Sequence, residues 1–171
     1  DSFRSFSPAV QWIVAVFMML FGVNFNLYYL ILIKQARSVL KDEELKWYLG
    51  IIAVATFMIT LDLTVTRHPF ADSLRLAFFQ VTSIVSTTGF SSTNFELWPG
   101  FTKGLIFVLT FVGGCTGSTG GGLKIQRIAV LVKNAFRTVR KAGNPRRVES
   151  IKLNGRTLDE SIVTGITGYF S

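Results

Sequence analysis

Two short stretches of the chain carry residue types suited to handling a dehydrated cation. The first is Ser86-Thr87-Thr88-Gly89-Phe90, which follows an apolar segment and holds no charge. Main-chain carbonyls in such a loop can replace the hydration shell of a cation. Gly89 fits because glycine reaches positive φ at little cost, which lets successive carbonyls point the same way. We therefore predict a cation filter at Thr87, Thr88 and Gly89, with the threonine hydroxyls as secondary acceptors.

The second stretch holds six glycines within ten residues, 113–122. Each glycine costs ~1 kcal/mol in a helix relative to alanine, so packing of small residues does not explain six of them. We predict a helix broken inside the membrane, which can obstruct a permeation path and move aside; the alternative is a kink needed only for packing. Lys124, just after it, is either an interfacial charge or part of the gate. The candidate gate comprises Gly113, Gly114, Cys115, Thr116, Gly117, Ser118, Thr119, Gly120, Gly121, Gly122 and Lys124.

Other chemistry fits these residues poorly. A phosphate loop would need Lys at position 123 followed by Ser or Thr, whereas the chain has Leu123-Lys124-Ile125. Ser118 has no evident base, because His68 is the sole histidine and is predicted on the outer side. The single cysteine, Cys115, excludes an internal disulfide and a multi-cysteine metal site. We predict neither enzymatic activity nor a cofactor.

The segments that must position these stretches are apolar. Charged residues make up 16% of the chain, against roughly 25% in soluble domains, and the mean hydropathy is +0.43. Segments 9–33, 47–66 and 101–132 are predicted to cross the membrane. Segment 72–94 begins at a candidate N-cap, Asp72, as a helix too short to cross, and ends in the polar loop. It is predicted to be re-entrant, the alternative being an extracellular loop with an amphipathic helix.

The basic residues predict the orientation. Fourteen of the 18 Lys and Arg lie in residues 34–46 and 124–156, so both tracts are predicted to be cytoplasmic. This interpretation accounts for the net charge of +8 better than a nucleic-acid surface does. Asn154-Gly155 predicts a type I′ hairpin, and Ile162 begins another apolar helix.

These elements define the predicted fold class. It is an all-α polytopic membrane protein with a helix–re-entrant pore loop–helix repeat of a potassium-channel-like fold and a glycine-broken pore-lining helix.

Residues 111–127, together with Ser86 to Phe90, resemble the bacterial Trk/Ktr potassium-uptake family, and the resemblance covers essentially the whole chain. It implies four such repeats around one pore. Residues 1–46 would end the second repeat with membrane helix 9–33 and a cytoplasmic linker. Residues 47–144 would form the third, with helix 47–66, pore helix and filter 72–94 and broken helix 101–132. Residues 145–171 would form a cytoplasmic hairpin and begin the fourth.

The resemblance also implies a function and partners. It implies potassium uptake through a filter-lined, gated pore of a multi-pass protein in the bacterial inner membrane, with Phe90 supporting the filter. The implied partners are membrane lipid, a second copy in a homodimer and a TrkA-like cytoplasmic nucleotide-binding ring, but no nucleic acid. The alternatives are a sodium or poorly selective monovalent cation transporter and a non-conducting membrane scaffold. One filter loop cannot surround an ion, so we expect the other loops from a longer polypeptide; the alternative is a split protein whose other loops come from another chain.

Overall fold

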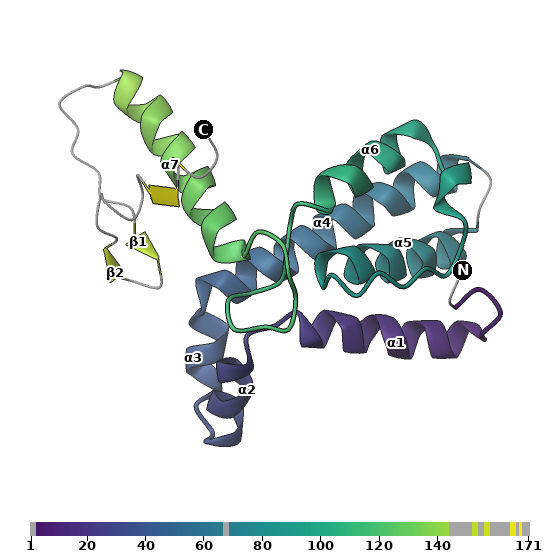
Figure 1. Ribbon diagram of the computed structural model, residues 1–171, viewed down its shortest axis with the longest axis horizontal. Coiled ribbons are helices and arrows are strands. Elements are labelled where there is room, and N and C mark those ends of the chain that lie inside the picture. The colour runs from purple at the N-terminus through teal and green to yellow at the C-terminus, as the bar shows by residue number, and fades with distance from the viewer. Residues whose placement is uncertain are drawn as a thin grey trace.

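The computed structural model describes residues 3–66 and 69–143 and the short pieces 152–153, 156–157, 165–166 and 168. The described chain is helical apart from one 3-10 turn, irregular connections and a pair of two-residue strands (Figure 1). Its elements are α1 (Pro8–Phe21), α2 (Phe25–Leu32), α3 (Ala36–Lys41), α4 (Glu43–Val65), α5 (Phe70–Val85), η1 (Phe95–Leu97), α6 (Gly100–Leu109), α7 (Ile125–Gly143), β1 (Lys152–Leu153) and β2 (Arg156–Thr157).

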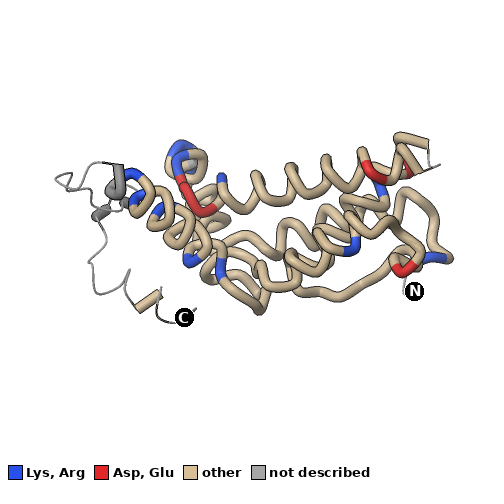
Figure 2. Tube along the Cα trace, turned by 90° about the horizontal axis from the view of Figure 1, so that it is seen from above, with Lys and Arg blue, Asp and Glu red and all other residues tan. Residues whose placement is uncertain are grey.

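Helix α4 is the longest apolar element of the described chain and lies alongside α5 and α6. It begins at Glu43, earlier than the predicted Trp47, because Asp42 caps it by accepting a hydrogen bond from Leu45 N at 2.8 Å. Two glutamates in its first turn suit the positive end of the helix dipole. Figure 2 shows no charged residue along the middle of this helix. Among the described helices, α4 alone is long and apolar enough to cross a membrane unaided.

The single helix predicted over residues 9–33 is wrong. The chain forms α1 and α2 instead, bent by 93° at a short break, although the pair together would satisfy the length and hydropathy of one span. Gly22 follows the last turn of α1, and the Asn24 side chain caps α2 by accepting a hydrogen bond from Asn26 N at 2.9 Å. The carbonyl of Gly22 and the N–H of Phe25, on either side of the break, form hydrogen bonds to the glycine-rich stretch of residues 113–122. These tertiary contacts stabilise the break.

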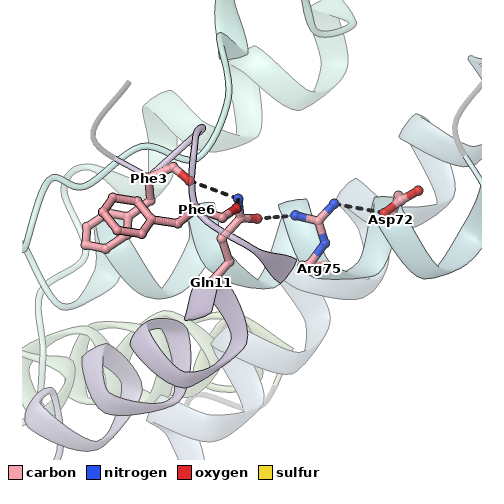
Figure 3. Close-up of polar contacts among 5 residues, drawn as sticks. All are labelled: Phe3, Phe6, Gln11, Asp72 and Arg75. Carbon is pink, nitrogen blue, oxygen red and sulfur yellow. Dashed lines mark hydrogen bonds and ion pairs between the residues drawn. The ribbon is translucent and has the colours of Figure 1, made fainter. Parts of the chain in front are cut away.

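Helix α5 begins at Phe70 after Pro69, so Asp72 is not the N-cap that the sequence predicted. Instead, the Asp72 carboxylate lies in the first turn, where it pairs with Arg75 at 2.8 Å. Arg75 also donates to the side chain of Gln11 on α1 (Figure 3). Proline suits this position because the first helical N–H groups have no partner within the helix.

Gln11 joins α1 to the N-terminal turn as well as to α5. Its side chain is only 4% exposed, and Nε2 donates to the carbonyls of Phe3 at 2.9 Å and Phe6 at 3.2 Å (Figure 3). With Arg75 on the amide oxygen, both ends of the buried amide are satisfied. This network fixes the start of α1 against the start of α5.

The break predicted within residues 101–132 is confirmed. Helix α6 ends at Leu109 and α7 begins at Ile125, with an irregular connection between them. The predicted end at residue 132 is wrong, because α7 continues to Gly143. Asp62 of α4 caps the start of α6: its Oδ2 accepts from Thr102 N at 3.2 Å and from Thr102 Oγ1 at 2.5 Å.

The two strands pair antiparallel, with Lys152 opposite Thr157 and Leu153 opposite Arg156. This register is the one expected for the predicted two-residue turn at Asn154-Gly155, which itself lies outside the described residues. His68 also lies outside them, as does Ile162, the predicted start of the last helix. Gly165, Ile166 and Gly168, farther along, are helical.

Candidate filter loop and glycine-rich loop

The candidate filter loop, residues 86–94, leaves the C-terminal end of α5. Thr87 has φ +58° and Gly89 has φ +78°, so two of the three predicted filter residues adopt the left-handed backbone conformation. Glycine takes this conformation without strain, whereas a β-branched threonine takes it only when its surroundings hold it there. The positive φ predicted for Gly89 is therefore present, and Thr87 adds a second one that the sequence did not predict.

Ser83 of α5 holds the loop in this conformation. Its carbonyl accepts hydrogen bonds from Thr88 N at 2.9 Å and Gly89 N at 3.3 Å, and its hydroxyl donates to the Phe90 carbonyl at 2.5 Å. The side chain of Ser83 is fully buried. The N–H groups of the loop are thus turned towards the helix end.

The carbonyls of the loop differ from its N–H groups in having no hydrogen-bond partner among the described residues. Within the described part of the chain, the carbonyl oxygens of Thr87, Thr88 and Gly89 accept no hydrogen bond, and all three residues are exposed. They lie at the end of α5, which carries about half a negative charge from the helix dipole. The ring of Phe90 packs against the ring of Phe3 at a tilt of 51°, with 5.0 Å between the ring centroids. Three consecutive carbonyl oxygens at this helix end thus have no hydrogen-bond donor among the described residues.

The glycine-rich loop, residues 110–124, returns on itself between α6 and α7. Gly113 N donates to the Leu123 carbonyl at 2.9 Å, and Leu123 N donates to the Phe111 carbonyl at 3.2 Å. The two ends of the loop approach so closely that a Cβ at Gly113 would lie 2.0 Å from the Gly121 carbonyl oxygen. Glycine is required at position 113 for this reason.

The middle of the glycine-rich loop is bonded to the break between α1 and α2, where Figure 1 shows the two lying side by side. Cys115 N donates to the Gly22 carbonyl at 2.9 Å, and Phe25 N donates to the Gly117 carbonyl at 3.2 Å. Cys115 is completely buried. The loop and the bend of α1–α2 therefore satisfy each other's backbone groups, as buried backbone requires.

Glu44, in the first turn of α4, holds the loop from another side. Its Oε1 accepts a hydrogen bond from Thr116 N at 2.6 Å, and its side chain is only 6% exposed. Thr116 Oγ1 bonds to Gln126 Oε1 at 2.9 Å and links the loop to α7. A buried carboxylate that accepts a backbone hydrogen bond is a strong anchor.

The loop also reaches the candidate filter directly. Gly121 N donates to Thr87 Oγ1 at 2.7 Å, and a Cβ at Gly120 would lie 3.2 Å from the Ser86 carbonyl oxygen. Lys124 Nζ donates to the Gly120 carbonyl, so an ammonium group lies on the loop. The structure thus brings the two predicted stretches into contact.

Ser118 has a structural role in this loop. Its hydroxyl donates to the Cys115 carbonyl at 2.6 Å, and its backbone N–H donates to the same oxygen at 3.1 Å. Both bonds tighten the turn within the loop. The position of His68, the base considered for this serine, lies outside the described residues.

Sequence reasoning missed Glu44 and Gln11. The sequence gives no reason to single out Glu44 from the neighbouring acidic residues Asp42 and Glu43, because its partner, Thr116, lies 72 positions farther along the chain. Gln11 did carry a local signal, because it is a polar residue within an apolar helix. A buried amide needs hydrogen-bond partners, so such a glutamine indicates a contact with another segment.

Almost the whole chain is similar to known proteins in both sequence and structure. A family model described as "TrkH: Cation transport protein" matches residues 1–170. The potassium uptake protein TrkH of Salmonella typhimurium is 36% identical over 96% of this chain, and TrkI of Halomonas elongata is 30% identical over 95%. The chain covers 35% and 33% of those relatives, about a third of their length. The crystal structure of the potassium transporter TrkH from Vibrio parahaemolyticus superposes with a TM-score of 0.91 at 31% identity, over 99% of this chain and 38% of that one.

Proposed function

The chain belongs to the TrkH family of cation transport proteins, and we propose that it forms one of four pore-loop repeats in a potassium uptake protein. In this proposal it is the third repeat, flanked by the end of the second and the start of the fourth. The names of its relatives support potassium as the transported ion. Because the chain spans about a third of their length, the remaining loops would come from the rest of the polypeptide.

Potassium would enter from the outside at the candidate filter loop. Carbonyls of Thr87, Thr88 and Gly89, together with those of the other repeats, replace the hydration shell of the ion. The negative end of α5 adds a favourable field at the same point. An inward movement of one charge at −100 mV gains about 2.3 kcal/mol, so the membrane potential drives uptake.

The glycine-rich loop would act as the gate beneath the filter. In the closed arrangement the loop lies against Thr87, and the ammonium of Lys124 repels an approaching cation. Opening requires the bond from Gly121 to Thr87 and the bond from Thr116 to Glu44 to be broken or stretched. Without a side chain at Gly113, the ends of the loop can stay close while its middle moves.

The partners belong to the same proposal. The basic residues gather at the end of the molecule that carries α3 and α7 (Figure 2), which would face the cytoplasm of a bacterial cell under the inner membrane. That end would contact a TrkA-like nucleotide-binding ring, and two complete polypeptides would form a homodimer. No cofactor is assigned.

One observation carries the proposal: the candidate filter loop, whose three carbonyls accept no hydrogen bond from the described residues, is itself hydrogen-bonded to the glycine-rich loop. Rubidium and sodium uptake into proteoliposomes that hold the complete polypeptide tests it, with and without excess potassium. Rubidium uptake that potassium suppresses and sodium does not is the expected result. Equal uptake of both ions would instead support a poorly selective transporter, and no uptake by folded protein would support the scaffold.

A further inference from the structure

A long apolar groove lies between α4 and α6, and no residue of the candidate filter loop lines it. Its volume is about 490 Å³, and it is lined by Lys46, Trp47, Gly50, Ile51, Val54, Ala55, Met58, Leu105 and Leu109. Most of the lining comes from one face of α4, and α6 closes the other side with its two leucines. From Lys46 to Met58 the groove follows about 18 Å of helix at 1.5 Å per residue. Its volume is within the range of small-molecule sites, roughly 300–1,000 Å³.

The polar groups of the groove lie at one end. Lys46 is exposed, and within the described chain its ammonium forms no hydrogen bond or ion pair. Trp47 beside it is half-buried, and in the same part of the chain its indole N–H has no acceptor. Every other lining residue is apolar or glycine. A ligand with a negatively charged head and a long apolar tail is complementary to this lining.

The place of this end relative to the membrane points to the same ligand. Lys46 closes the basic tract of residues 34–46, which the proposed orientation puts at the cytoplasmic surface, and tryptophan is typical of the membrane interface. The cytoplasmic leaflet is the one that carries anionic lipids. The apolar remainder of the groove then lies at the depth of the acyl chains.

We infer that this groove holds one anionic phospholipid of the inner leaflet, its phosphate on Lys46 and Trp47 and one acyl chain along α4 to Met58. The lipid would contact both α4 and α6. The first turn of α4 also holds the glycine-rich loop, through Glu44. The inference uses the membrane orientation of the proposed function but not ion flux, so lipid binding is measurable even if transport fails.

The test measures thermal unfolding of the complete polypeptide in detergent, titrated with phosphatidylglycerol or with phosphatidylcholine of the same acyl chains. Phosphatidylglycerol should raise Tm by mass action, and phosphatidylcholine should do so only at much higher concentration. Lys46→Gln should raise the concentration for half the effect roughly tenfold or more, the loss expected for one charge-assisted contact. Lys46→Arg should retain the response. Lys41→Gln, an exposed lysine outside the groove, is the matched charge control.

A second variant tests the apolar part independently of the lysine. Gly50 lines the groove and has no atom within 4 Å of the place where a Cβ would lie, so Gly50→Leu fills the groove without a clash. It should abolish the phosphatidylglycerol response, whereas Gly104→Leu, at an equally open glycine of α6 outside the groove, should not. Equal effects of the two lipids, or of Lys46→Gln and Lys41→Gln, would overturn the inference. An unchanged lipid response combined with a changed molar mass in Gly50→Leu would also overturn it, because protein would then cover the groove.

Discussion

Replacing Thr87 by valine removes the acceptor of the hydrogen bond that joins the candidate filter loop to the glycine-rich loop. Thr87 Oγ1 accepts from Gly121 N at 2.7 Å in the arrangement that we propose to be closed. Valine has the same shape and the same β-branching, so the cost of the positive φ of +58° at this position stays the same. The change isolates the hydrogen bond.

The size of the effect follows from where the bond lies. Both Thr87 and Gly121 are exposed, so water can satisfy the released N–H, and the net loss is that of an ordinary hydrogen bond, about 0.5–1.5 kcal/mol. At 1.36 kcal/mol per factor of ten, the ratio of open to closed protein should rise roughly 2- to 13-fold. Basal rubidium uptake should rise by the same factor.

The assay is initial rubidium uptake by proteoliposomes that hold the complete polypeptide. Thr87→Ser keeps a hydroxyl and should raise uptake less than Thr87→Val does. Thr64→Val removes a hydroxyl that bonds within α4, to the Thr60 carbonyl at 2.7 Å, and should leave uptake at the wild-type level. Uptake in Thr87→Val at or below the wild-type rate would refute the reasoning.

The remaining predictions concern the anchors of the two loops and of α1. Gly113→Ala places a Cβ 2.0 Å from the Gly121 carbonyl oxygen, so it should displace the glycine-rich loop and raise basal rubidium uptake; a closed-level rate would count against the gate. Glu44→Ala should lower the free energy of unfolding by about 1.5–3 kcal/mol, because it removes a buried charged acceptor. Glu43→Ala, which removes a half-exposed ion pair with Lys133, should cost below about 1 kcal/mol, and denaturant titration that finds equal losses would contradict the contrast. Gln11→Ala leaves Arg75 without its amide acceptor and should cost about 1–3 kcal/mol in the same titration, whereas a change near zero would show that the network in Figure 3 does not hold α1.

Local signals in the sequence were enough to predict the end of α5 and the break before α7. Ser86 and the polar residues after it stop the apolar pattern, and the helix ends at Val85. Six glycines in ten residues are incompatible with a regular helix, and the structure has an irregular loop there. In both cases the cause lies within a few residues of the effect.

The break between α1 and α2 has a weak local signal. Asn24 interrupts an apolar run and caps α2, but one asparagine in an apolar run does not by itself distinguish an N-cap from an amide that bonds to a neighbouring helix. The bend is then stabilised by Cys115 and Gly117, more than 90 positions farther along the chain. No window of local sequence contains that contact.

The candidate site shows the same division between local and distant causes. Gly89 and its positive φ were predictable from residue type, whereas the left-handed conformation of Thr87 depends on the hydrogen bonds of the loop to Ser83 and on Gly121. The role of Glu44 as a hydrogen-bond acceptor for the glycine-rich loop was not predicted, because it depends on the tertiary contact with Thr116. Anchors of this kind come from packing between segments and have no signature of their own.

The most direct test of the central claim, that the carbonyls of Thr87, Thr88 and Gly89 select the ion, is the rubidium-to-sodium uptake ratio of Gly89→Ser. Gly89 has φ +78° and open space around it, so serine strains the backbone of the loop without a clash elsewhere. Gly104→Ser, at an open glycine within α6 and not in the candidate filter loop, is the matched control. The ratio should fall in Gly89→Ser and stay at the wild-type value in Gly104→Ser. An unchanged ratio in a folded, conducting Gly89→Ser protein would contradict the filter assignment.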